Sequence, residues 1–121
     1  MQGKPDTRRS LGEFEVLLLL AVLRLRSQAY GAGVLREIEE TTGREVSQGA
    51  VYTGLDRLEA RGLVSSTVGE PTPERGGRRR RYYRLETRGA LSLSRSLQAI
   101  ERMARGAREQ LRLAAQEGGG L

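Results

Sequence analysis

The chain has 121 residues, which is the size of one domain and enough for a modest hydrophobic core. Its 21 basic and 15 acidic residues leave a formal charge of +6, a balance typical of proteins that bind nucleic acid or an anionic membrane surface. Cysteine and histidine are both absent, which excludes disulfides and removes the usual ligands of a zinc site, so we expect no metal and no cofactor.

The chain starts with a polar segment, residues 1–9, which we expect to be a flexible arm. Ser10 with Glu13 three residues later has the form of a capping box, which predicts a helix from here to about Arg26. This helix is apolar on nearly all sides, a pattern that requires cover on more than one face. The longest apolar run, Val16 to Leu23, has eight residues, whereas a membrane span needs about 18. Because no secretory signal is recognisable either, we expect a soluble cytoplasmic protein without a membrane partner.

A short second helix follows a connection of small residues, 27–33. Val34, Leu35 and Ile38 lie at helical spacing and predict its buried side. Gly43 is placed to end this helix, because glycine readily adopts the left-handed conformation that closes a helix.

The third predicted helix begins after Ser47, a good N-cap residue, and stops at Gly62. An apolar stripe at i, i+4 and i+7 predicts its buried side; it consists of Val51, Leu55 and Leu58. At 100° per residue, the opposite face carries Gly49, Tyr52, Thr53, Asp56 and Arg57.

Two short strands are predicted next, over Leu63–Val68 and Arg79–Leu85. The intervening GEPTPERGG contains two prolines, so we expect a loop into which neither strand extends. Five arginines fall within seven positions of the loop and the second strand: Arg75, Arg78, Arg79, Arg80 and Arg81. The sequence therefore predicts a hairpin with a long basic tip.

A final helix is predicted over residues 90–116, before a disordered tail, 117–121. Its apolar seam has the 4, 3, 4, 3, 4, 3 spacing of a heptad repeat and consists of Leu93, Leu97, Ile100, Ala104, Ala107, Leu111 and Ala114. The seam could be core within one chain or an interface between two copies. The other elements are too small to cover both this seam and the first helix, which favours a homodimer. The predicted dimerisation residues are Phe14, Leu17, Leu18, Leu93, Leu97, Ile100, Ala104, Ala107 and Leu111.

The expected fold is mainly α with a small β-hairpin, an α+β arrangement. Residues 10–89 would form a winged helix-turn-helix, and residues 90–116 a long C-terminal dimerisation helix. In such an arrangement, a helix enters the major groove of DNA, while a basic hairpin reaches the phosphates or the minor groove. The predicted partner is double-stranded DNA.

Two runs, VSQGAVYTGLDRLEARGLVSS over residues 46–66 and RRYYRLETRGAL over residues 80–91, resemble the PadR family of bacterial transcriptional regulators. The resemblance extends over about residues 10–105. It implies a homodimeric winged-helix repressor that binds a pseudo-palindromic operator. It also implies a small-molecule effector, held near the dimer interface between the N-terminal and C-terminal helices.

This sequence departs from the family pattern at three places. Thr53 stands where the family often has proline, and Gly31 is followed by Ala32 where tyrosine is usual. Thr87 is displaced, because Glu86 separates it from Leu85. These departures leave the fold prediction intact and weaken any transfer of an operator sequence.

Predicted DNA contacts lie on the third helix and the hairpin: Ser47, Gln48, Gly49, Tyr52, Thr53, Arg57, Arg75, Arg78, Arg79, Arg80 and Arg81. Gln48 and Thr53 are the candidates for base edges. Ser47 is an N-cap first and a phosphate contact second. Tyr52 could face DNA or pack in the core, and Asp56 could pair with Arg57 or Arg61. The arginine run could also be a solvated charge run.

Two other functions are compatible with parts of this sequence. The tyrosines in a basic strand would suit an RNA- or ribosome-associated winged-helix module. The heptad seam would suit a coiled-coil adaptor with an incidental basic loop. An enzyme is not expected, since no Ser-His arrangement, paired carboxylates or phosphate-binding glycine loop is recognisable.

Overall fold

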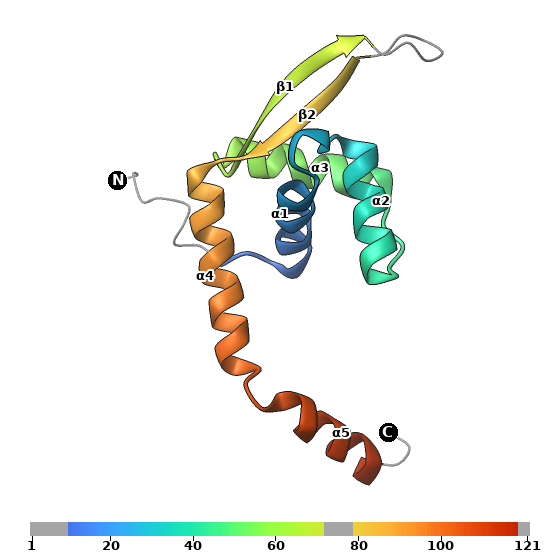
Figure 1. The fold of residues 1–121 in the computed structure, drawn as a ribbon, viewed down its shortest axis with the longest axis vertical. Coiled ribbons are helices and arrows are strands. Elements are labelled where there is room, and N and C mark those ends of the chain that lie inside the picture. Colours follow the sequence, from blue (N-terminus) through green and yellow to red (C-terminus); the bar gives the residue numbers. More distant parts are fainter. Residues whose placement is uncertain (1–9, 72–78, 119–121) are drawn as a thin grey trace.

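The computed structural model describes residues 10–71 and 79–118, and it is mostly helical with one antiparallel hairpin (Figure 1). Its elements in chain order are α1 (Glu13–Leu25), η2 (Arg26–Gln28), α2 (Gly31–Thr42), α3 (Gln48–Ala60), β1 (Val64–Pro71), β2 (Arg79–Leu85), α4 (Thr87–Met103) and α5 (Ala107–Gly118). This matches the predicted winged helix-turn-helix. The predicted arm (1–9), the hairpin tip with Arg75 and Arg78, and the last residues of the tail (119–121) lie outside the described residues.

Helix α1 begins at Glu13, so the predicted capping box of Ser10 and Glu13 is wrong. The N-cap is Gly12, whose backbone N–H donates to Oε1 of Glu15 at 2.8 Å. Glu13 instead accepts a hydrogen bond from Arg44 at 2.7 Å, and this bond lowers the pKa of the Glu13 carboxyl. The cap therefore comes from Glu15, whose Oε1 bonds Gly12 while its Oε2 lies 3.2 Å from Nη1 of Arg61.

The second helix, α2, begins at Gly31, three residues before the predicted apolar stripe. Its end is as predicted, because Gly43 adopts a left-handed conformation with φ of 77°. The turn that follows is fixed by side chains: the backbone N–H of Val46 donates to Oε2 of Glu39 at 3.1 Å, and that of Arg44 donates to Oγ1 of Thr42 at 3.1 Å. These bonds hold the angle between α2 and α3.

Helix α3 has the predicted ends and the predicted buried side. Oγ of Ser47 accepts a hydrogen bond from the N–H of Ala50 at 3.0 Å, which confirms the N-cap. Val51, Leu55 and Leu58 are fully buried against the rest of the head. Gly62, with φ of 78°, follows the helix and turns the chain into β1.

The hairpin of β1 and β2, called the wing below, pairs Val64 with Leu85 at its base and Val68 with Arg81 further out. The register shifts between Val68 and Pro71, and β1 continues to Pro71. The prediction that no strand enters the GEPTPERGG loop is therefore wrong at its first residues. Proline is tolerated there because β1 is an edge strand and the pairing is already irregular.

Residues 29–30 lie alongside β2 and hydrogen-bond to it. An antiparallel bridge pairs Tyr30 with Tyr82, and the N–H of Tyr83 donates to the carbonyl of Ala29 at 2.8 Å. Residues 29–30 thereby tie the base of the wing to the segment that leads into α2.

The predicted single C-terminal helix is broken into two. It begins at Thr87 rather than Ala90, and α4 ends at Met103. Gly106 then adopts φ of 75°, a conformation outside the helical region, and α5 starts at Ala107. In Figure 1, α4 descends from the head and α5 turns to run below it. In the described part of the chain, no helix has the length and apolar character that crossing a bilayer requires.

Candidate nucleic-acid interface

The outward face of α3 is exposed, as its helical periodicity predicts. Gly49, Thr53, Asp56 and Arg57 are all exposed, and so are Ser47 and Gln48 at its start. The hydroxyl of Ser47 is engaged by the cap described above. Of the predicted α3 contacts, this leaves Gln48, Thr53 and Arg57 with side chains that can reach outward.

Tyr52 is packed on one side and accessible on another. Its ring lies against the start of α2, since a Cβ atom at Gly31 would stand only 2.2 Å from Cε1 of Tyr52. The side chain nevertheless stays 39% exposed. Gly31 is thus required for packing, a role that the spacing of the α2 stripe did not reveal.

The described arginines of β2 differ in what they contact. Arg79 and Arg81 are exposed, and Nη1 of Arg81 donates to Oγ of Ser66 at 3.0 Å. Arg80 is half-buried, and its guanidinium carbon lies 4.1 Å from the centroid of the Tyr30 ring. This cation–π contact holds Arg80 to the base of the wing.

Tyr30 is itself held on two sides. Its ring meets that of Tyr82 edge to face, with centroids 5.7 Å apart, and its hydroxyl accepts a hydrogen bond from Nη2 of Arg36 at 3.0 Å. This cluster links α2 to the wing. Sequence reasoning missed it because its members are far apart along the chain.

A hydroxyl connects α3 to the wing. Oγ of Ser66 on β1 donates to Oε2 of Glu59 on α3 at 2.8 Å and accepts from Arg81 on β2. Figure 1 shows α3 running beneath the hairpin, which this bridge joins to it. The two elements predicted to contact DNA are therefore held in a fixed relation.

Two acidic residues, Glu15 and Asp56, act on side chains that lie beside α3. Nη1 of Arg61 lies 3.2 Å from Oε2 of Glu15 on α1. Burial raises the pKa of the Tyr83 hydroxyl, and the negative charge of Asp56 adds to this effect. Tyr83 therefore stays neutral within the core, where it is buried.

The predicted dimerisation residues fall into three groups by exposure. Leu18 and Leu93 are buried inside the single chain, so we remove them from the proposed interface. Phe14, Leu17, Leu97 and Ala107 are half-buried, whereas Ile100, Ala104 and Leu111 are exposed. The seam is thus core near the head and open surface further along the chain.

A model of the family described as "Transcriptional regulator PadR-like family" matches residues 19–95. The complex structure of hsRosR-S4 is similar with 25% identity and a TM-score of 0.62, over 94% of this chain and 96% of that chain. A PadR family transcriptional regulator from Eggerthella lenta is also 25% identical, with a TM-score of 0.63 over 82% of this chain and 86% of that one. A PadR-like transcriptional regulator from Bacillus cereus shares the fold at 22% identity, with a TM-score of 0.64 over 81% and 90%. No curated protein matches the sequence significantly.

Proposed function

The chain belongs to the PadR-like family of transcriptional regulators, and on this premise we propose that it is a homodimeric repressor of a pseudo-palindromic operator. Members of the family are DNA-binding transcriptional regulators, not enzymes, and this chain is accordingly a DNA-binding transcriptional regulator. In the proposal, the dimer acts in the cytoplasm and lowers transcription by covering a promoter.

The observation that carries the proposal is the exposed polar face of α3 beside a basic wing. Gln48 and Thr53 are proposed to read base edges in the major groove, and Arg57 to contact a phosphate. Gly49 faces open space, since a Cβ atom there would meet nothing within 4 Å, and its lack of a side chain is proposed to let the helix approach the duplex closely. Arg79 and Arg81 are proposed to contact phosphates from the wing. The same role is proposed for Arg75 and Arg78.

The proposed dimer uses the open part of the C-terminal seam. Ile100 and Leu111 of the seam are 56% and 67% exposed, and Met103 beside the seam is 86% exposed; exposed apolar side chains gathered along one surface are typical of an interface. Two heads related by a two-fold axis would address half-sites about 34 Å apart, or a multiple of that. An effector held between the N-terminal and C-terminal helices would change this spacing and release the operator.

The test of this function is selection of bound fragments from the organism's genomic DNA. We expect the enriched fragments to share an inverted repeat whose half-sites are separated by about one helical turn, or a multiple of it. Such a result would give the operator and the regulated promoter together. If the enriched fragments share a site without an inverted repeat, or share no site, the proposal of a two-fold symmetric dimer on DNA is contradicted.

The same selection is repeated with a Thr53→Ala variant, and the two sets of enriched sequences are compared. If Thr53 reads a base, its removal should relax the sequence preference at one position of each half-site, at a cost of about 1–3 kcal/mol on the original operator. A uniform weakening on all sequences would instead assign Thr53 to the backbone.

The wing is expected to supply affinity without sequence preference. Replacing Arg79 and Arg81 with alanine should weaken binding to operator and random duplex alike, because phosphate contacts are the same in both. If each arginine neutralises one phosphate, the slope of log K against log salt should fall in magnitude by roughly 1.8 for each wing, or about 3.6 for a bound dimer. Fluorescence anisotropy at several salt concentrations measures both effects.

The control for the wing removes the same charge elsewhere. Arg102 and Arg108 are exposed on α4 and α5, away from the hairpin, and their replacement with alanine should leave the salt slope unchanged. An equal loss of slope in both double variants would mean that net charge, rather than wing contacts, determines the affinity.

A further inference from the structure

An open pocket lies between the C-terminal end of α1 and the base of the wing. Its volume is about 590 Å³, within the range of about 300–1,000 Å³ that small-molecule sites occupy. Its walls come from α1 and η2 on one side and from residues 65–67 and 82–85 of the two strands on the other. We call it the α1–wing pocket.

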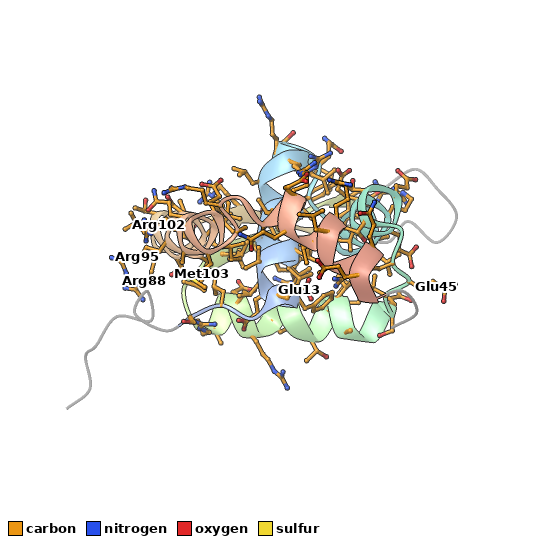
Figure 2. All side chains as sticks on the ribbon, turned by 90° about the horizontal axis from the view of Figure 1, so that it is seen from below. Glu13, Glu45, Arg88, Arg95, Arg102 and Met103 are labelled. Carbon is orange, nitrogen blue, oxygen red and sulfur yellow. The ribbon has the colours of Figure 1, made fainter. Side chains whose placement is uncertain are left out.

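This pocket is separate from the outward face of α3, although the wing strands supply one of its walls. Figure 2 shows α1 running from Glu13, which lies beside α3, toward the opposite side of the head. The residues of α1 that line the pocket, Val22 and Leu23, lie near the far end of that helix. A ligand there would leave the outward face of α3 free.

The lining combines an apolar floor with a positive rim. Val22, Leu23 and Leu85 supply the apolar surface, and Leu23 remains 51% exposed. Arg26 and Arg84 stand on opposite walls, and the lining residues include no aspartate or glutamate. The guanidinium of Arg84 is largely exposed and lies 3.8 Å from the Glu86 carboxylate, which also accepts a hydrogen bond from Oγ of Ser65 in the lining. Two guanidinium groups at the rim therefore face one adjacent carboxylate, which leaves a net positive charge. The pocket therefore favours an anion that carries an apolar body.

The backbone at Arg26 gives an independent indication. Its φ is 54°, and within residues 10–71 and 79–118 it is the only residue other than glycine with positive φ. Glycine occupies the comparable positions after α2 and α3, namely Gly43 and Gly62. A strained non-glycine backbone of this kind costs on the order of 1–3 kcal/mol and recurs at functional sites. The chain thus has a strained arginine at the pocket, where glycine would fit without strain.

We propose that the α1–wing pocket binds a small organic carboxylate, with the carboxylate between Arg26 and Arg84 and the apolar body on Val22, Leu23 and Leu85. Occupancy would reach the DNA-binding elements through Ser66. This residue lines the pocket, and its hydroxyl is the bridge between Glu59 of α3 and Arg81 of the wing. This second step rests on the proposed function, whereas the binding itself does not.

The binding test uses backbone-amide NMR spectra of the whole chain without DNA. Octanoate and 2-naphthoate are the probes. The controls are 1-octanol, which has an apolar chain but no charge, and inorganic phosphate, which is an anion without an apolar part. We expect saturable shifts at about millimolar probe or below, at residues 22–27, 65–67 and 82–85. Shifts confined to α4 and α5, no saturable shifts, or equal binding of either control would overturn the proposal.

Two variants separate the site from the fold. Arg26→Gly removes the charge and also relieves the backbone, so its unfolding temperature should be unchanged or higher while probe affinity falls about tenfold. Arg84→Gln should weaken the probe by a similar factor. Arg102→Gln, on the exposed surface of α4, should bind like the unmodified chain. Undiminished binding by both Arg26→Gly and Arg84→Gln would overturn the proposal.

The coupling through Ser66 is tested by adding duplex DNA. Saturating octanoate should change the DNA affinity of the unmodified chain by about fivefold or more, and leave that of Arg26→Gly unchanged. An unchanged affinity of the unmodified chain, with the NMR shifts intact, would overturn the coupling alone. Failure of the chain to bind any DNA would instead count against the proposed function.

Discussion

Replacing Gly89 with alanine is expected to lower the free energy of unfolding by about 3 kcal/mol, near the upper end of what overpacking usually costs. A Cβ atom at this position of α4 would stand 2.1 Å from the carbonyl oxygen of Leu63 and 2.9 Å from Cδ1 of Leu85. The carbonyl has no freedom to move away, because it accepts the N–H of Glu86 at 2.9 Å. The substitution must therefore displace α4 or break the hydrogen bond between the carbonyl of Leu63 and the N–H of Glu86, which precedes the first residue of α4.

Gly49→Ala is the matched control, because it makes the same change in another helix. A Cβ atom there would meet nothing within 4 Å, and alanine is the better helix former. Stability should therefore be unchanged or rise by up to about 1 kcal/mol, as measured by urea unfolding with circular dichroism. Equal stability of the two variants would show that α4 does not depend on close contact at Gly89.

The helix-turn-helix was predictable because its signals are local. An i, i+4, i+7 stripe, a serine N-cap and a following glycine specify α3 within a short window, and each of these features is found in the structure. Gly43 and Gly62 are also local signals, since both adopt the positive φ that their positions require. The exposed face of α3 follows from the same periodicity.

Other features depend on contacts between distant segments, which periodicity does not contain. The first residue of α2, Gly31, must be glycine because the ring of Tyr52 occupies the space that a Cβ atom would need. Arg80 is drawn onto Tyr30 rather than outward, so one of the predicted DNA contacts is part of the packing of the wing. The Ser66 bridge and the strained Arg26 are likewise products of the folded arrangement.

The break between α4 and α5 had a sequence signal that the heptad pattern obscured. Gly106 lies within the predicted helix, but the apolar residues before and after it keep the 4, 3 spacing. In the structure its φ is 75°, so the two halves of the seam no longer lie on one straight helix. A repeat in the sequence therefore need not correspond to a single rod, and the proposed dimer must accommodate the bend.

Placing aspartate at both Ile100 and Leu111 is expected to convert the proposed dimer to monomers and to weaken operator binding by about 100-fold or more. Both side chains are mainly exposed in the single chain, so the change should not disturb its fold. Buried in a dimer interface, the two carboxylates would lose their hydration without gaining partners. A monomer also loses the effective concentration that linking two heads provides, which amounts to about 10²–10⁴ in affinity.

Light scattering measures the assembly, and anisotropy on operator and half-site duplexes measures the binding. The half-site affinity should not change, because α3 and the wing lie outside the altered surface. Gln98→Asp combined with Gln110→Asp adds the same charges to the same two helices, off the seam, and should leave a dimer. A double seam variant that stays dimeric would contradict the interface. If the Gln98→Asp, Gln110→Asp variant also became monomeric, the added charge on α4 and α5 would explain the dissociation, and the loss of apolar seam residues would not.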